Sequence, residues 1–148
     1  MNNYFYNNIG ICATSIISVL KEYNDDIELT KIFLIMPFIS HKQLLNHLCR
    51  ATTNIQSIDS LIIDKNSHFT NFNKRFNQSI ILTINTIQYL NDIENIAIKD
   101  NKVVLIKDIS YNNEMGKRAE KIYKASANIS NILKETNEKL FLNLRIEL

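Results

Sequence analysis

The sequence holds three histidines and two cysteines, the side chains best suited to acid-base, nucleophilic or metal chemistry. His41 attracts most interest because it follows the apolar run in "KIFLIMPFISHKQLL". His41 and His47 are six residues apart, so on a regular helix they diverge and cannot share one metal ion. Cys49 is two residues from His47 and points elsewhere for the same reason. A small hydrolase based on His41 is therefore the least favoured of three functional hypotheses, and no catalytic or metal-binding residue is assigned.

Phosphate-binding loops and nucleophile elbows are also missing from the sequence. Gly10 and Gly116 are the two glycines, so no glycine-rich loop can cradle a phosphate. The acidic pairs Asp25-Asp26 and Asp59-Asp64 lie in polar turns or at helix starts, where helix capping explains them better than a catalytic dyad. The sequence therefore predicts a protein that is not an enzyme and needs no cofactor.

Composition places the chain among ordinary globular proteins. Of its 148 residues, 45% are hydrophobic and 22% charged, with a net charge of +2 that does not by itself predict nucleic-acid binding. No cationic leader and no long apolar run is present, so we expect a cytoplasmic protein without membrane contact. Cys12 and Cys49 are isolated in helical patterns, which favours two buried thiols over a disulfide or a metal pair.

The first third of the chain, about residues 8–50, reads as helices. Apolar residues recur every three or four positions from Asn8 to Tyr23, with Asn7 or Asn8 as the cap. Leu29 to Met36 predicts a second helix, kinked or split near Pro37, and the apolar face continues through 44–48. His41 and Lys42 should then reach the surface, where His41 serves either as a docking residue or as an ordinary helix cap.

The middle of the chain, about residues 57–107, has the order of a winged helix: helix, turn, helix and hairpin. A short helix over 58–63 precedes three phenylalanines at helical spacing, and Ser79 should cap a helix to Asp92 whose inward positions are Ile80, Ile81, Ile84, Ile87 and Leu90. Two strands should flank the Asp100-Asn101 pair. The helix over 79–92 lacks Lys and Arg, which argues against DNA reading, although Lys99, Lys102 and Lys107 are candidate phosphate contacts.

The last part, residues 113–148, begins with the most regular pattern of the sequence. Met115, Ala119, Ile122, Ser126, Ile129 and Leu133 form a heptad seam, which predicts a helix that packs on its own domain rather than on a second chain. The tail "LFLNLRIEL" predicts a closing strand or a helical turn that leads into one. The expected fold is thus mainly α with a small β-hairpin (α+β), in a single domain over 1–148.

Several short motifs occur in an order that resembles the middle component of three-component ABC systems, the small subunit of Lamassu-type bacterial defence operons. They are "NNIGICA" at the first helix, "FLIMPFISHK" with Pro37, His41 and Lys42, "NFNKRF" with Arg75, and the tail around Arg145. The family usually has proline where Ile9 stands, Thr-Arg after its His-Lys pair, and Leu-Gly-Val in its tail.

The resemblance implies a non-catalytic adaptor between an SMC-like or RecN-like ABC ATPase and an effector, commonly a nuclease. It implies contact with DNA through the complex and not by the subunit alone. The candidate partner-binding residues are Phe38, His41, Lys42, Arg75 and Arg145. A winged-helix DNA-binding regulator is the alternative.

Overall fold

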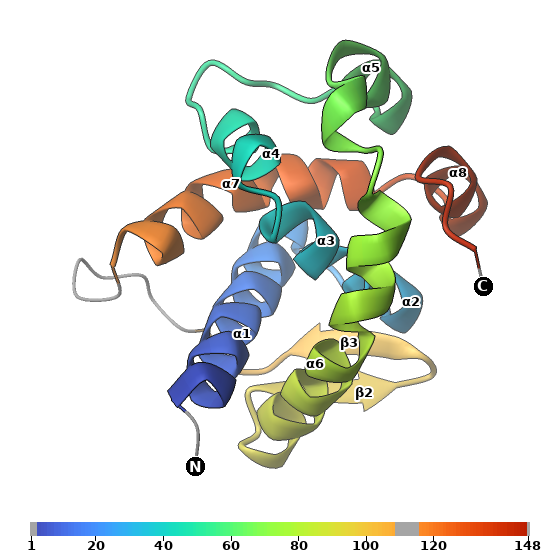
Figure 1. The fold of residues 1–148 in the computed structure, drawn as a ribbon. Helices are drawn as coiled ribbons and strands as arrows, with labels where there is room; N and C mark the ends of the chain where they lie inside the picture. Colours follow the sequence, from blue (N-terminus) through green and yellow to red (C-terminus); the bar gives the residue numbers. More distant parts are fainter. Residues whose placement is uncertain (1–2, 109–115, 148) are drawn as a thin grey trace.

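Helices dominate the computed structural model, which describes residues 3–108 and 116–147, with side chains from residue 8 onward (Figure 1). One small antiparallel sheet accompanies them. The mainly helical α+β class predicted from the sequence is therefore confirmed.

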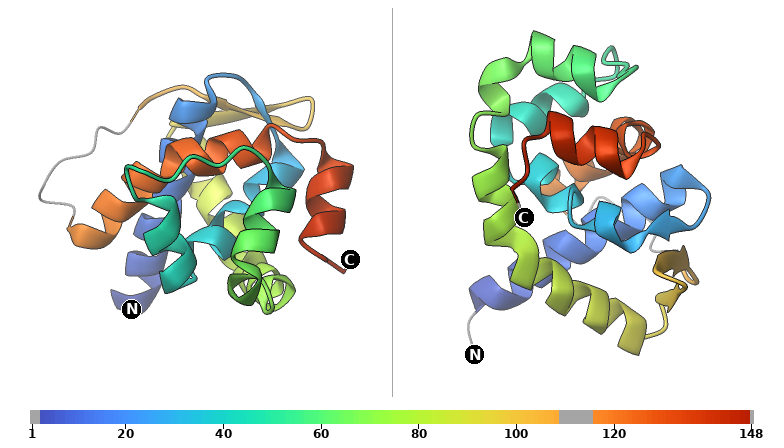
Figure 2. Two further views of the ribbon diagram at one scale, coloured as in Figure 1. Left: turned by 90° about the horizontal axis from the view of Figure 1, so that it is seen from above. Right: turned by 90° about the vertical axis from the view of Figure 1, so that its right-hand side faces the viewer.

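Helix α1 (Asn3–Tyr23) lies at the centre of the molecule (Figures 1 and 2). It buries Cys12, Ile16, Val19 and Leu20, as the apolar spacing predicted, and it packs against α6 and α7. The helix already begins at Asn3, so the prediction that Asn7 or Asn8 caps it is wrong. Asn24 follows the helix with a φ of 56°, a left-handed conformation that asparagine tolerates.

The second apolar segment is divided into three short helices, α2 (Leu29–Ile32), α3 (Ile35–Ile39) and α4 (Lys42–Leu48). The first division lies at Phe33 and Leu34, ahead of Pro37. Pro37 is the third residue of α3, a position whose N–H would have no helical acceptor, so the ring costs no hydrogen bond there. The segment is divided as predicted, but the predicted place of the break is wrong, because it precedes Pro37, which lies in the first turn of a helix.

The sheet has three strands in the order β1 (Ile27–Glu28), β3 (Lys102–Leu105), β2 (Ile96–Lys99). The hairpin β2–β3 turns at Asp100 and Asn101, whose φ angles of 52° and 61° are those of the predicted two-residue turn. Strand β1 pairs Ile27 with Val103, and the N–H of Leu29 donates to the carbonyl of Asn101 at 2.8 Å. The hairpin turn therefore also holds the first residue of α2.

Helix α5 (Ile58–Asp64) forms where a short helix was predicted, and a 3-10 turn (Asn66–His68) connects it to the long helix α6 (Phe72–Asp92). Ser79 does not cap a separate helix as predicted, because α6 already begins at Phe72 and buries Ser79. The predicted inward face is also partly wrong. Thr83 and Thr86 are buried, whereas Ile81 and Ile84 are exposed.

Helix α7 (Lys117–Leu133) follows residue Gly116, and Met115 of the predicted seam lies outside the described residues. Its seam buries Ile122, Ser126, Ile129 and Leu133 against the same chain, mainly on α1 and α4, so the predicted intramolecular packing is confirmed. The tail forms helix α8 (Asn137–Asn143), capped by Thr136, whose hydroxyl accepts from the N–H of Lys139 at 3.2 Å. No strand follows it within residues 144–147.

A buried asparagine on α7 fastens the connection between α4 and α5. The Oδ1 atom of Asn128 accepts from the N–H of Ile55 at 3.2 Å, and its Nδ2 donates to the carbonyls of Leu48 and Thr53 at 2.8 and 3.1 Å. The main-chain groups of this connection thus obtain a side-chain partner from a helix distant in sequence.

Candidate functional site

Phe38 was named as a candidate partner-binding residue, and the structure places its side chain in the core. The ring is 0% exposed and packs edge-on against Phe72 at 5.0 Å and Phe69 at 6.2 Å between ring centroids. Aromatic contacts of this geometry stabilise a core beyond simple area burial. A direct contact of Phe38 with a partner would require this cluster to open, so Phe38 supports the core here and its role in partner binding stays a prediction.

His41 caps helix α4. Its backbone is extended, and its Nδ1 atom accepts a hydrogen bond from the N–H of Leu44 at 3.1 Å. This bond satisfies one of the N–H groups that lack a partner in the first turn of a helix. Of the two alternatives for His41, capping is thus observed, while docking stays a prediction.

The imidazole of His41 also lies beside two basic groups. The rings of His41 and His68 are 5.2 Å apart between centroids. Burial lowers the pKa of His41, and the nearby Arg75 and His68 lower it further. The neutral form, which is the form that can accept the bond from Leu44, is therefore favoured in the folded protein.

Arg75 joins the segments that surround His41. Its Nε atom donates to the carbonyl of Pro37 and a terminal NH₂ donates to the carbonyl of His68, both at 3.0 Å. The guanidinium also lies 5.3 Å from the centroid of the Phe72 ring. Because Arg75 is half-buried and two of its N–H groups donate to α3 and to the 3-10 turn, it holds these segments to α6.

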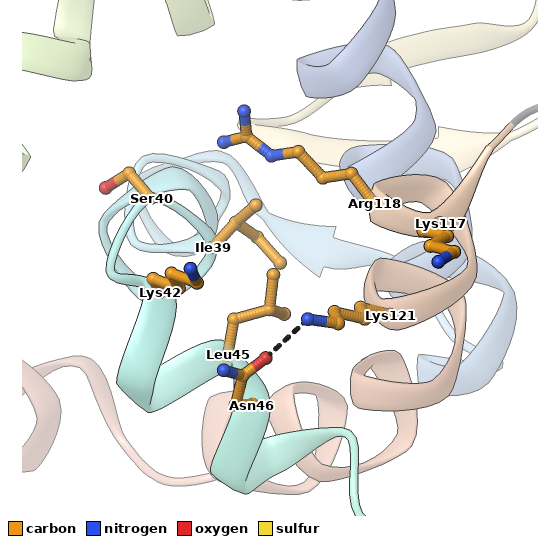
Figure 3. A pocket seen from close by; sticks show the side chains of 8 residues that line it. All are labelled: Ile39, Ser40, Lys42, Leu45, Asn46, Lys117, Arg118 and Lys121. Carbon is orange, nitrogen blue, oxygen red and sulfur yellow. Dashed lines mark hydrogen bonds between the residues drawn. The ribbon is translucent and has the colours of Figure 1, made fainter.

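Lys42 is exposed and lies at the edge of a cleft of about 410 Å³ between α3, α4 and the start of α7 (Figure 3). We call this the basic cleft and define it by its four cationic residues, Lys42, Lys117, Arg118 and Lys121. Figure 3 shows Arg118 and Lys121 reaching from α7 toward α3 and α4, where Lys121 Nζ donates to Asn46 Oδ1 at 2.8 Å. The α7 residues of the cleft were not among the candidates named from the sequence. The sequence feature that could have indicated the cleft is the group of cations at the start of the predicted helix.

The three lysines assigned to the hairpin are exposed. Lys99 and Lys102 face each other directly across the β2–β3 ladder, and Lys107 follows β3. The structure therefore brings Lys99 and Lys102 together but places them on different elements from Lys42. Arg145 is likewise separate from the other candidates. It follows α8 with a φ of 55° and is exposed beside Leu142 and Leu144 in a surface cavity.

An exposed apolar face on α6 escaped the sequence analysis. Ile81 is 72% exposed and Ile84 is 48% exposed, and Gln88 continues the same face at helical spacing. We call these three residues the outer face of α6. No Lys or Arg occurs between Phe76 and Asp92. The absence of cations was recognised in the sequence, but the direction of the isoleucines was not.

The two thiols are free, as predicted. Cys12 is fully buried against α6, and burial raises its pKa to about 11, although the hydroxyls of Thr86 and Thr83 lower it in part. Cys49 is partly buried, and its thiol donates to the carbonyl of Asn46 at 3.3 Å. Across residues 3–108 and 116–147, no three His, Cys, Asp or Glu side chains converge as metal ligands would.

Comparison with known proteins identifies the family. None of the helices in the described ranges combines the length and apolar character needed to cross a bilayer. Neither the curated proteins nor the solved structures include a significant match to this chain. A family model does match, over residues 3–148, which is nearly the whole sequence. The chain therefore belongs to the family described as ABC-three component (ABC-3C) system Middle Component 3.

Proposed function

We propose that this chain is a non-catalytic adaptor that bridges an SMC-like ABC ATPase and an effector in a Lamassu-type defence complex. Family membership supports the existence of other subunits, since a middle component is one part of a system with several components. In this proposal the subunit acts in the cytoplasm as a single domain. It couples the sensing of foreign DNA by the ATPase to activation of the effector.

The arrangement of α5, α6 and the β2–β3 hairpin supports a winged-helix interpretation of the middle of the chain. Figure 1 shows α6 running from α5 at the top to the hairpin at the bottom. In a winged helix that binds DNA, the helix in the position of α6 enters the major groove. The residues on the exposed side of α6 therefore decide between a DNA surface and a protein surface.

The outer face of α6 is the observation that carries the adaptor proposal. A helix that reads DNA brings arginine or lysine to bases and phosphates. Here Ile81 and Ile84 are exposed, and the helix has no cation beyond Arg75. Aliphatic side chains on a face without charge suit the centre of a protein interface. We therefore propose this face as the main contact with a partner subunit.

Co-purification of the tagged chain with the ATPase and effector encoded beside it tests the proposal. The double change Ile81→Glu and Ile84→Glu should abolish capture of a partner at physiological salt, because it places two charges in an apolar interface. Ile63→Glu is the matched control, since Ile63 is 81% exposed on α5 and receives the same substitution. Capture that survives the double change, or a wild-type chain that purifies alone, would contradict the proposal.

A DNA-binding regulator is the second candidate, and the hairpin favours it. Like charges placed directly opposite on a ladder are mildly destabilising, as Lys99 and Lys102 are here. Phosphates would relieve that repulsion. Changing Lys99, Lys102 and Lys107 to Gln should abolish a salt-dependent shift of duplex DNA if this candidate is correct. DNA binding that persists in the triple variant would exclude the hairpin as the DNA contact.

A further inference from the structure

The basic cleft lies away from the outer face of α6, between α3, α4 and the start of α7. Figure 1 shows the start of α7 and helix α4 on one side of the molecule, while the second half of α6 lies with the hairpin at the bottom. Ile39, Ser40, Leu45 and Asn46 complete the lining of the cleft. Ile39 and Leu45 form its largely buried apolar floor.

The charge of the cleft is unbalanced. Four cationic side chains line it, and no aspartate or glutamate of the described ranges does so. Lys42, Lys117 and Arg118 make no ion pair with any residue in 3–108 or 116–147. Lys121 is satisfied by the neutral amide oxygen of Asn46. Glu120, in the first turn of α7, attracts Lys117 but does not line the cleft. The cleft therefore carries a positive potential that the described part of the fold neutralises only in part.

Three of these cations also occupy positions that helix electrostatics disfavour. Lys42 is the first residue of α4, and Lys117 and Arg118 are the first two residues of α7. A helix N-terminus carries partial positive charge and favours acidic side chains, so cations there weaken the helix. Local rules broken without a compensating contact mark functional sites. Lys42 and Arg118, which form no ion pair within the described residues, therefore favour an anionic ligand at the cleft.

The lining indicates which kind of anion fits. Sequence-independent binding of single-stranded nucleic acid uses aromatic rings on which bases stack. No aromatic side chain lines the cleft among the described residues. Its floor is aliphatic, and its rim is cationic. We propose that the basic cleft binds an acidic peptide segment of a partner protein, with carboxylates on the four cations and an apolar side chain on Ile39 and Leu45.

Fluorescence anisotropy of the purified full chain tests the proposal with two labelled probes. The first is a short peptide that repeats Glu-Asp-Leu, and the second is a matched peptide that repeats Gln-Asn-Leu. The acidic peptide should bind, its affinity should fall as salt rises, and the amide peptide should not bind. The double change Lys42→Glu and Arg118→Glu should weaken binding about tenfold or more, because two attractions become repulsions.

A double variant with the same change in net charge provides the control. Lys99→Glu with Lys102→Glu alters the hairpin and should leave peptide binding within about twofold of the wild type, because screened charges at a distance contribute little. Equal loss in both variants, binding of both peptides alike, or no binding of the acidic peptide would each overturn the proposal. The proposal would also be overturned if a short duplex DNA bound the cleft and the acidic peptide did not. None of these outcomes depends on the outer face of α6, which is tested by co-purification.

Discussion

The Nε atom of Arg75 donates a hydrogen bond of 3.0 Å to the carbonyl oxygen of Pro37, across 38 positions of sequence. That carbonyl lies near the end of α3, where main-chain acceptors lack helical donors. The same guanidinium bonds the last residue of the 3-10 turn, His68. One side chain thus completes two helix ends, which explains its half-buried position better than a waiting partner does.

Replacing Arg75 should therefore destabilise the protein. Arg75→Ala should lower the free energy of unfolding by about 2–4 kcal/mol, because two carbonyls lose a charged donor. Arg75→Lys should recover only part of this loss, since an ammonium cannot reach both acceptors as the planar fork does. Chemical denaturation measures both effects. Lys74→Ala, at the exposed neighbouring position, should change stability by no more than about 0.5 kcal/mol. An Arg75→Ala variant as stable as that control would contradict this stabilising role of Arg75.

His41 should contribute as a helix cap. His41→Ala should lower stability by about 1 kcal/mol, whereas His41→Asn should retain most of it, because asparagine is among the best capping residues. Thermal unfolding of the two variants separates the contribution of the capping hydrogen bond from that of side-chain packing. If both variants lose stability equally, the bond to Leu44 is not what the side chain contributes.

The cap should also make stability depend on pH. Since the pKa of His41 is lowered in the folded protein, the unfolded chain takes up the proton first as the pH falls. The stabilisation is fully present above the unfolded value of about 6.5 and declines as the pH falls through it toward the folded pKa. His47, whose pKa burial also lowers, contributes in the same direction. His41→Asn should flatten the curve between about pH 7 and 5 without abolishing it, and an unchanged slope would contradict this.

Asn128 should be the most sensitive polar residue of α7. Its amide serves three main-chain groups of the 48–55 connection, and it is nearly fully buried. Asn128→Ala should lower the free energy of unfolding by about 2–4 kcal/mol, because one buried N–H and two carbonyls lose their partner. Asn131→Ala, at an exposed position of the same helix, is the matched control. Amide exchange of Ile55 should accelerate in the first variant only.

At position 145, glycine should be more stabilising than any other residue type. Its φ of 55° places it in the left-handed region after α8, where the N–H of Ile146 donates to the carbonyl of Phe141 at 3.1 Å and the N–H of Arg145 to that of Leu142 at 3.2 Å. This is a Schellman ending, which glycine favours. Arg145→Gly should raise stability by about 0.5–1 kcal/mol, and Arg145→Ala should not, because alanine keeps the strained Cβ. Partner capture should decrease in both variants if the guanidinium also docks.

The sequence predicted the elements whose signals are local and missed those fixed by tertiary contact. The hairpin was predictable because Asp100 and Asn101 both tolerate positive φ and lie between alternating strands. Helices α1, α5 and α7 followed from apolar spacing. Strand β1 has two residues, too few for any periodicity, and it exists because β3 offers an edge. Helix α8 was obscured by alternating leucines, although Thr136 was a readable cap.

The partly wrong assignment of the inward face of α6 has a compositional cause. With 25 isoleucines in 148 residues, an apolar stripe occurs on surface faces as well as buried ones. The buried face instead carries Thr83 and Thr86, small enough to lie against Cys12 where α1 packs on α6. Small polar residues at such a close approach look exposed in a hydropathy pattern. Ile81 and Ile84 were assigned to the core for this reason and are exposed, whereas Phe38, named as a candidate contact, is internal.

The hydrogen bond from the N–H of Leu29 to the carbonyl of Asn101 connects the hairpin turn to the segment where β1 leads into α2. A ligand that displaced the turn would break the start of α2 and the pairing of β1 with β3 in the same movement. Glu28, beside that connection, also bonds Asn137 at the start of α8. A displacement of the hairpin tip would thus reach the start of α8, the last helix, through Leu29, Glu28 and Asn137.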